Sequence, residues 1–192
     1  MFTDEQKQFI QNHLRRPEND KDISKIAYLI STEFQKVDGE IQPEIAMQTA
    51  LLMNLGETDS RISYIYNSSF NWKEHPEAID LNKMHGQYSV EMAEKIGIIL
   101  SDEQKSVISG HSKNEYSSAL GQIIKIAEIC KATESQRWYR GEKKEPATSW
   151  EEVYNVLKED SNLLPQMIKL AELSYGKERF KIKEITEEDL SL

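Results

Sequence analysis

Cysteine is almost absent from this chain of 192 residues, since Cys130 is the only one. A lone cysteine cannot form a disulfide within the chain, which excludes the class of small extracellular domains stabilised by several disulfides. Cys130 lies within an apolar helical pattern. We therefore expect it to be a small core residue in a protein from a reducing compartment.

Long hydrophobic runs are also missing. The longest, over residues 96–100, is interrupted by Gly97 and is far shorter than the ~20 apolar residues that span a bilayer. The opening residues, MFTDEQKQFI, carry acids and glutamines where a signal peptide has a basic segment followed by an apolar one. We expect a soluble, cytoplasmic protein without a membrane partner.

Positive charge is in deficit. Lysine and arginine total 24 against 33 aspartates and glutamates, which gives a net charge of −9. A protein of this sign repels phosphate backbones at long range, so nucleic acid is not an expected partner. The length suits one domain with a sizeable core.

What the chain does have is helical periodicity, with apolar residues three and four positions apart in almost every segment. Capping boxes at Thr3 and Ser101 and a proline at position 43 indicate helix starts, and Gly39 indicates a helix end. These patterns predict an all-α fold in the form of a compact helical bundle. Helices are expected over residues 3–14, 23–37, 43–55, 87–95, 101–108, 120–130, 149–157 and 163–170.

Two segments interrupt the periodicity. Residues 66–83 are rich in Asn, Ser and Pro and are expected to form a connector of loop and short helical turn. The tail over residues 178–192 mixes apolar and charged residues and could be either a docked extension or a frayed end. We divide the chain into an N-terminal helix and linker (1–19), a main domain (20–175) and a C-terminal extension (176–192).

Five segments resemble, in order and spacing, the HD-GYP phosphodiesterases of the HD superfamily. Residues 50–57, ALLMNLGE, are similar to the Ala-Leu-Leu-His-Asp-Ile-Gly-Lys of that family. Residues 126–140, IAEICKATESQRWYR, are similar to its apolar helix that leads into a Ser-x-Arg-x-Tyr-Arg turn. Residues 22–29 are similar to its opening helix, and His85 falls at its later lone metal histidine. Gly110, His111 and Ser112 lie where the family has His-His-Glu, so two of those three residues are replaced. The resemblance implies an HD-type helical domain over about residues 20–175.

The metal-binding residues of that family are mostly replaced. HD enzymes use His and Asp ligands to hold metals that generate hydroxide and stabilise a phosphoryl group. Here Met53 and Asn54 occupy the positions of the His-Asp dyad, Asp22 replaces the first histidine and Glu128 a later aspartate. A neutral amide cannot supply the charge of a bridging carboxylate. The Gly-Tyr-Pro loop that names the family is missing as well.

The positions that correspond to the family's metal site form a remnant cleft, and they are Asp22, Met53, Asn54, His85, His111 and Glu128. Several residues in or near it have simpler interpretations. We expect His85 and His111 to be hydrogen-bonded or surface histidines rather than metal ligands, because the partners around them are lost. Asn54 is expected to satisfy buried backbone groups near its helix end. Glu57 replaces the lysine after the dyad and is expected to be solvated.

The segment after residue 134 suggests a contact surface. Arg137 and Arg140 have the chemistry to hold phosphate, although in the family the matching turn is architectural and its arginines pair with acids. Trp138 replaces the Pro between them, and an exposed tryptophan favours a protein partner.

The resemblance with its missing ligands implies a catalytically inactive pseudo-phosphodiesterase, without metal or other cofactor. Such a module would act in bacterial signalling by protein–protein interaction, and a homodimer stays open. Two rivals remain. One is a metal-free nucleotide or small-ligand sensor. The other is a residual single-metal phosphohydrolase that uses Asp22, His85, His111 and Glu128.

Overall fold

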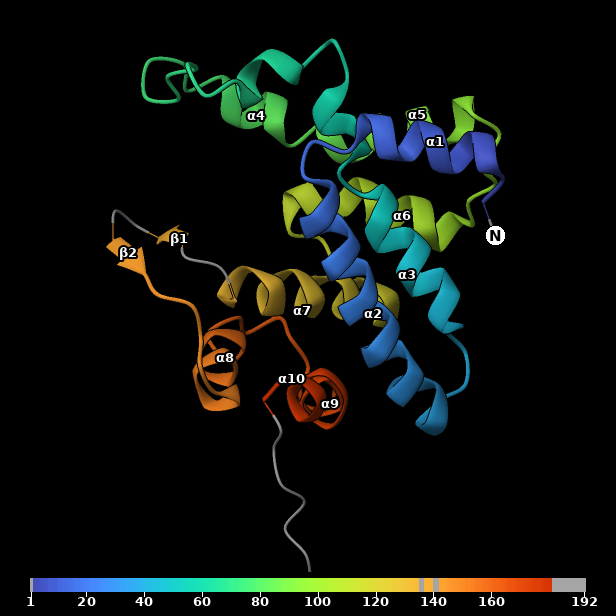
Figure 1. Cartoon of the computed structure of the whole chain (residues 1–192), viewed down its shortest axis with the longest axis vertical. Coiled ribbons are helices and arrows are strands. Elements are labelled where there is room, and N and C mark those ends of the chain that lie inside the picture. The colour runs from blue at the N-terminus through green and yellow to red at the C-terminus, as the bar shows by residue number, and fades with distance from the viewer. Residues whose placement is uncertain (1, 135–136, 140–141, 181–192) are drawn as a thin grey trace, which may run out of the picture.

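The computed structural model describes residues 2–134, 137–139 and 142–180. The chain is built from helices and one short hairpin (Figure 1). In order, its elements are α1 (Asp4–His13), α2 (Pro17–Val37), α3 (Pro43–Leu52), η1 (Leu55–Thr58), η2 (Ser63–Tyr66), α4 (Ala78–Asn82), α5 (His85–Lys95), α6 (Asp102–Gly110), η3 (His111–Lys113), α7 (Ala119–Thr133), β1 (Arg137–Tyr139), β2 (Glu142–Lys144), α8 (Trp150–Leu157), α9 (Pro165–Ala171), η4 (Glu172–Gly176) and α10 (Lys177–Phe180). The predicted all-α fold is confirmed.

Local sequence signals account for most helix ends. Thr3 and Ser101 form the predicted capping boxes with Gln6 and Gln104. The second helix begins earlier than its apolar stripe suggested, because Pro17 occupies its first turn, where the missing N–H is not needed. The expected connector over residues 66–83 begins at the last residue of the 3₁₀ turn η2 and contains α4 in addition to loop.

The main core surrounds α2, which packs against α3, α7 and the C-terminal helices (Figure 1). Ala27 and Ile30 on α2 and Ile123 and Ala127 on α7 are fully buried there. Cys130 is also fully buried, as its apolar pattern predicted. A second cluster joins α1 to α3, α5 and α6, and a third lies beneath the connector.

Near its end the chain leaves regular α-helix for one π-helical turn, η4. Gly176 ends this turn, and a Cβ there would lie 2.9 Å from the ring of Trp150 on α8. Bare backbone at this position therefore lets α8 pack closely against η4. Within the described residues, no helix is both long and apolar enough to cross a membrane.

Two glycines, Gly56 and Gly86, allow η1, α5 and α6 to pack closely against one another. A Cβ on Gly56 of η1 would lie 2.0 Å from the carbonyl oxygen of His85, at the start of α5. A Cβ on Gly86 would lie 2.3 Å from the carbonyl oxygen of Ile108, on α6. Both contacts involve backbone, which cannot rotate away as a side chain can. The start of α5 is thus held directly against η1 on one side and α6 on the other.

We expect Gly56→Ala to lower the free energy of unfolding by about 3 kcal/mol or more, because the methyl group has no space beside His85. Gly97→Ala is the matched control. Gly97 has a φ of +74° and no atom within 4 Å of the point where a methyl group would lie, so its cost is the left-handed strain of about 1 kcal/mol. Urea denaturation measures both. Equal costs would show that η1 and α5 are not in close contact.

Candidate functional site

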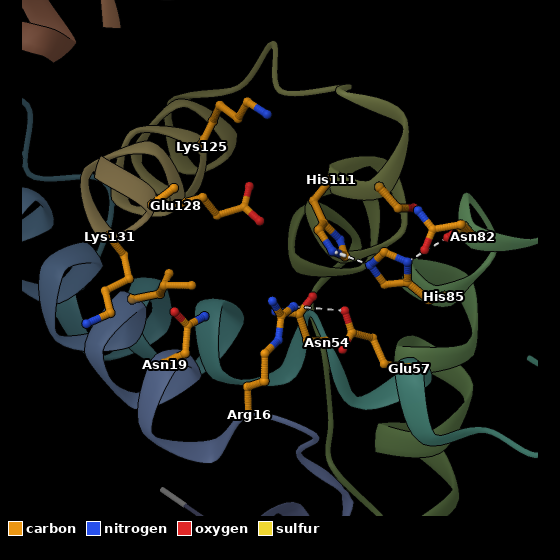
Figure 2. Close-up of a pocket in the computed structure, with 13 residues that line it drawn as sticks. Arg16, Asn19, Asn54, Glu57, Asn82, His85, His111, Lys125, Glu128 and Lys131 are labelled. Atoms are coloured by element: carbon orange, nitrogen blue, oxygen red, sulfur yellow. Dashed lines mark hydrogen bonds and ion pairs between the residues drawn. The ribbon is translucent and has the colours of Figure 1, made fainter. Parts of the chain in front are cut away.

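A cavity of about 520 Å³ opens between the N-terminal end of α2, η1, the start of α5, the end of α6 and α7 (Figure 2). Its lining is mostly polar and includes four of the residues that the sequence singled out: Asn54, His85, His111 and Glu128. These residues come from segments far apart in the chain. The cavity is therefore a product of the fold and the main candidate for a binding site.

Two other predicted cleft residues do not line the cavity. Met53 is fully buried in the main core, where its thioether is surrounded by apolar side chains. Asp22 binds Lys131, with its Oδ2 2.7 Å from the Nζ, and only the lysine reaches the cavity lining. On α2 the cavity is lined instead by Asn19 and Ile23, which lie on the neighbouring face of the helix.

The side chains of His85 and His111 face each other within the wall of the cavity. Their Nε2 atoms lie 2.8 Å apart. The Nδ1 of His85 is 2.6 Å from the carbonyl oxygen of Asn82, and the Nδ1 of His111 is 2.6 Å from that of Ile108. A carbonyl oxygen can only accept, so each Nδ1 carries a proton and donates it. Both rings are thereby fixed with Nε2 directed toward the same point.

The proton count of this pair is incomplete. Three contacts, two with carbonyls and one between Nε2 atoms, require three protons, whereas two neutral imidazoles carry two. Burial lowers the pKa of His85 and of His111 to about 4, which favours the neutral forms near pH 7. Two Nε2 lone pairs then point at each other. An additional proton or a donor from outside the pair would relieve this conflict.

Asn54, which corresponds to the Asp of the family's His-Asp dyad, forms a buried hydrogen bond. Asn54 donates from Nδ2 to the Oδ1 of Asp20 over 2.8 Å, and both side chains are almost fully buried. The partner is thus a carboxylate, whereas backbone had been expected. Burial raises the pKa of Asp20, and the hydrogen bond from Asn54 together with the nearby charge of Arg16 counteracts this rise.

Glu57 is the residue that the sequence interpretation placed wrongly, since its side chain is only 6 % exposed. Its Oε1 accepts from Nη2 of Arg16 over 3.1 Å. Its Oε2 has no hydrogen-bond partner, and the Nη1 of Arg15 is 3.9 Å away. Burial raises the pKa of Glu57, and the two arginines counteract the rise. The available signal was its place directly after a buried helix end and a glycine.

Glu128 lies on the α7 wall of the cavity, between Lys125 and Lys131 (Figure 2). Burial raises its pKa to about 7, although the charge of Lys125 opposes this. Lys131 is held by Asp22, whereas Lys125 donates to the side-chain oxygen of Asn114 over 2.7 Å. The pKa values perturbed by burial around the cavity mark it as a functional-site candidate.

The residues present do not fit the metal centre that the family resemblance implies. Among the described residues, no group of three or more His, Cys, Asp or Glu side chains is placed to hold an ion. Two imidazoles on one tetrahedral ion would have Nε2 atoms about 3.3 Å apart, whereas here they lie 2.8 Å apart. The amide of Asn54 is engaged with Asp20, and Asp22 with Lys131.

The predicted contact surface falls largely outside the described residues. Arg140 is one of the residues not described. Arg137 and Trp138 belong to β1, which pairs antiparallel with β2 so that Trp138 is opposite Lys143. The structure describes only the backbone of this hairpin, and the roles of the three side chains stay predictions.

We expect Asn54→Asp to destabilise the protein by about 2 kcal/mol near neutral pH, because a second carboxylate would stand beside buried Asp20. One carboxyl of the pair would have a raised pKa in the folded state. The loss is therefore complete above that pKa and diminishes as the pH falls toward ~4, the range of unfolded aspartate. Urea denaturation at two pH values measures it. Exposed Asn12→Asp is the control, and an equal cost at both sites would contradict the buried pair.

We expect Glu128→Gln to become more stable than the wild type as the pH rises. Folded wild type retains a proton between the ordinary pKa of 4.5 and about 7, so its stability falls across this window, whereas Gln has nothing to ionise. The difference should grow by on the order of 3 kcal/mol across this window. Glu74→Gln, at an exposed site, should show no such trend. A flat difference for Glu128→Gln would place its carboxylate in solvent.

Comparison with protein-family models, with curated proteins and with solved structures found no match. The resemblance to HD-GYP domains therefore stays a prediction that depends on the five sequence segments alone. The chemistry of the cavity has to be interpreted from its own residues.

Proposed function

We propose that the chain is a catalytically inactive regulatory module related to the HD-GYP phosphodiesterases, with a cavity that binds a small ligand without hydrolysing it. In this proposal the module acts in the bacterial cytoplasm, and its interaction with a protein partner depends on whether a ligand occupies the cavity. The observation that carries it is the hydrogen bond between Asn54 and Asp20.

That hydrogen bond supports a regulatory role because it engages the residue that corresponds to the bridging Asp of the His-Asp dyad, which is therefore not available to bind a metal. In a working enzyme a carboxylate there would have its oxygens available to bridge two ions. Here an amide fills the position and its N–H donor is directed at another buried acid. A hydrolase would require this pair to separate, which would leave the carboxylate of Asp20 buried without its donor.

The cavity favours the ligand-sensing alternative over a purely structural remnant. Decayed sites without a ligand are expected to be filled by apolar side chains, since buried polar groups are costly when unpaired. This site keeps an open volume, an unpartnered carboxylate oxygen on Glu57 and two imidazole Nε2 atoms directed at one point. A bound ligand would satisfy groups that the protein leaves unsatisfied.

Support for a protein partner comes from residues 64–84, which include the connector. Four large apolar side chains are exposed along residues 64–84: Tyr64, Trp72, Ile79 and Met84. The segment projects from the bundle in Figure 1. Exposed aromatic and methionine side chains are over-represented at protein interfaces. The same segment contains Asn82, whose carbonyl fixes His85 at the cavity. Ligand state and the exposed surface are thus connected through a few residues.

Metal content separates this proposal from a residual hydrolase. We expect protein purified without chelator to contain no stoichiometric metal, and manganese or iron(II) to leave its melting temperature unchanged. A phosphodiester such as bis-(p-nitrophenyl) phosphate should not be hydrolysed with either ion. Protein treated with EDTA and dialysed is the control and should behave identically. Stoichiometric metal with turnover that is lost in His85→Ala would overturn the proposal.

A further inference from the structure

The two sides of the cavity differ in chemistry (Figure 2). The side formed by η1, α5 and the end of α6 presents acceptors, which are the carboxylate of Glu57 and the Nε2 atoms of His85 and His111. The opposite side, on α7, presents the ammonium groups of Lys125 and Lys131 and, between them, the carboxyl group of Glu128, whose pKa burial raises to about 7. A ligand that spans the cavity would therefore contact hydrogen-bond acceptors at one end and ammonium groups at the other.

On the acceptor side, Arg16 donates to the Oε1 of Glu57, and the remaining acceptor atoms have no donor. The Oε2 of Glu57 is buried without a hydrogen-bond partner, and the whole side chain is only 6 % exposed. The two Nε2 atoms face each other because both Nδ1 protons are directed at carbonyl oxygens. Leaving a buried acceptor unsatisfied costs about 1–3 kcal/mol. A ligand group with several N–H donors would remove this cost, and a protonated amine carries three.

The α7 side has one cation available for a ligand. Lys125 forms no ion pair with a carboxylate in the described part of the chain, and it donates to Asn114 while lying 5.3 Å from the ring centroid of Tyr116. Lys131 is already paired with Asp22. Asn19 adds an amide near the first turn of α2, where helix N–H groups point outward. An acidic group is the complementary ligand for Lys125.

We propose that the cavity binds a zwitterionic small molecule, with a protonated amine that donates to Glu57 and the histidine pair and an acidic group that contacts Lys125. This inference rests on the proposed ligand-binding function and names its ligand class. A volume of about 520 Å³ accommodates such a molecule together with water. The arrangement also predicts specificity, because an amine alone would leave Lys125 without an acidic partner and an acid alone would meet the carboxyl groups of Glu57 and Glu128 without an amine to contact them.

Isothermal titration calorimetry with matched probes tests the inference. Glucosamine 6-phosphate carries both groups, glucose 6-phosphate lacks the amine and glucosamine lacks the phosphate; O-phosphoethanolamine, ethyl phosphate and ethanolamine form a shorter set. In at least one set, we expect the zwitterion to bind about tenfold or more tighter than either half. Equal binding of a half molecule, or no binding in both sets, would overturn the inference.

Two variants assign the ends of the ligand. Glu57→Gln should reduce the preference for the zwitterion over the probe without an amine to about twofold or less. Lys125→Gln should do the same for the probe without an acid. Exposed Glu74→Gln and Lys73→Gln should leave both preferences intact. If Glu57→Gln fails to fold, Lys125→Gln still decides, since loss of the acid preference supports the inference and its retention overturns it. The metal and turnover measurements above test inactivity independently, so a failure here is distinguishable from a failure of the proposed function.

Discussion

The close contact between backbone segments at Gly56 and Gly86 is the constraint on which the polar cavity depends. It places the first turn of α5 against η1 and α6, with backbone oxygens where a side chain would otherwise be. Ser89 reinforces the contact, because its Oγ accepts from the N–H of Gly56 and lies 2.7 Å from the carbonyl oxygen of Met53. The end of α3, η1 and α5 are therefore joined by direct contacts. Glu57, Asn54 and His85 keep their relative positions for that reason.

The buried carboxyl groups of Asp20 and Glu57, which lie beside this contact, are only partly stabilised by their partners. Asp20 has an amide donor and Glu57 has two arginines, yet burial raises the pKa of both acids. Well-packed apolar residues in their place would give a core that is at least as stable. In the proposed function, a bound ligand contacts these groups. The stability that they cost the free protein would then return on binding.

The sequence predicted the helices well because each is specified locally. Apolar spacing, the capping boxes at Thr3 and Ser101 and the prolines at helix starts all act within a few residues, and the structure follows them. The cavity depends on contacts between distant segments, and here prediction was uneven. Asn54, His85, His111 and Glu128 do meet, but Asp22 lies on the wrong face of α2 and Met53 in the core. Glu57 was expected to be solvated because its place after a buried helix end and a glycine is a weak local signal, and its burial depends on the distant Arg16 and α5. The family assignment, the domain boundaries and the contact role of the 137–140 segment stay predictions.

The lone cysteine offers a natural reporter of motion in α7. Burial raises the pKa of Cys130 and keeps its sulfur away from solvent, so the thiol cannot react while the helix is in place. Alkylation then has to wait for α7 to open, and its rate measures how often that happens. The same helix carries Lys125, Glu128 and Lys131 along the cavity. Ligand binding in the cavity would therefore slow the alkylation of Cys130, and no residue or fluorescent label has to be introduced into the protein to measure it.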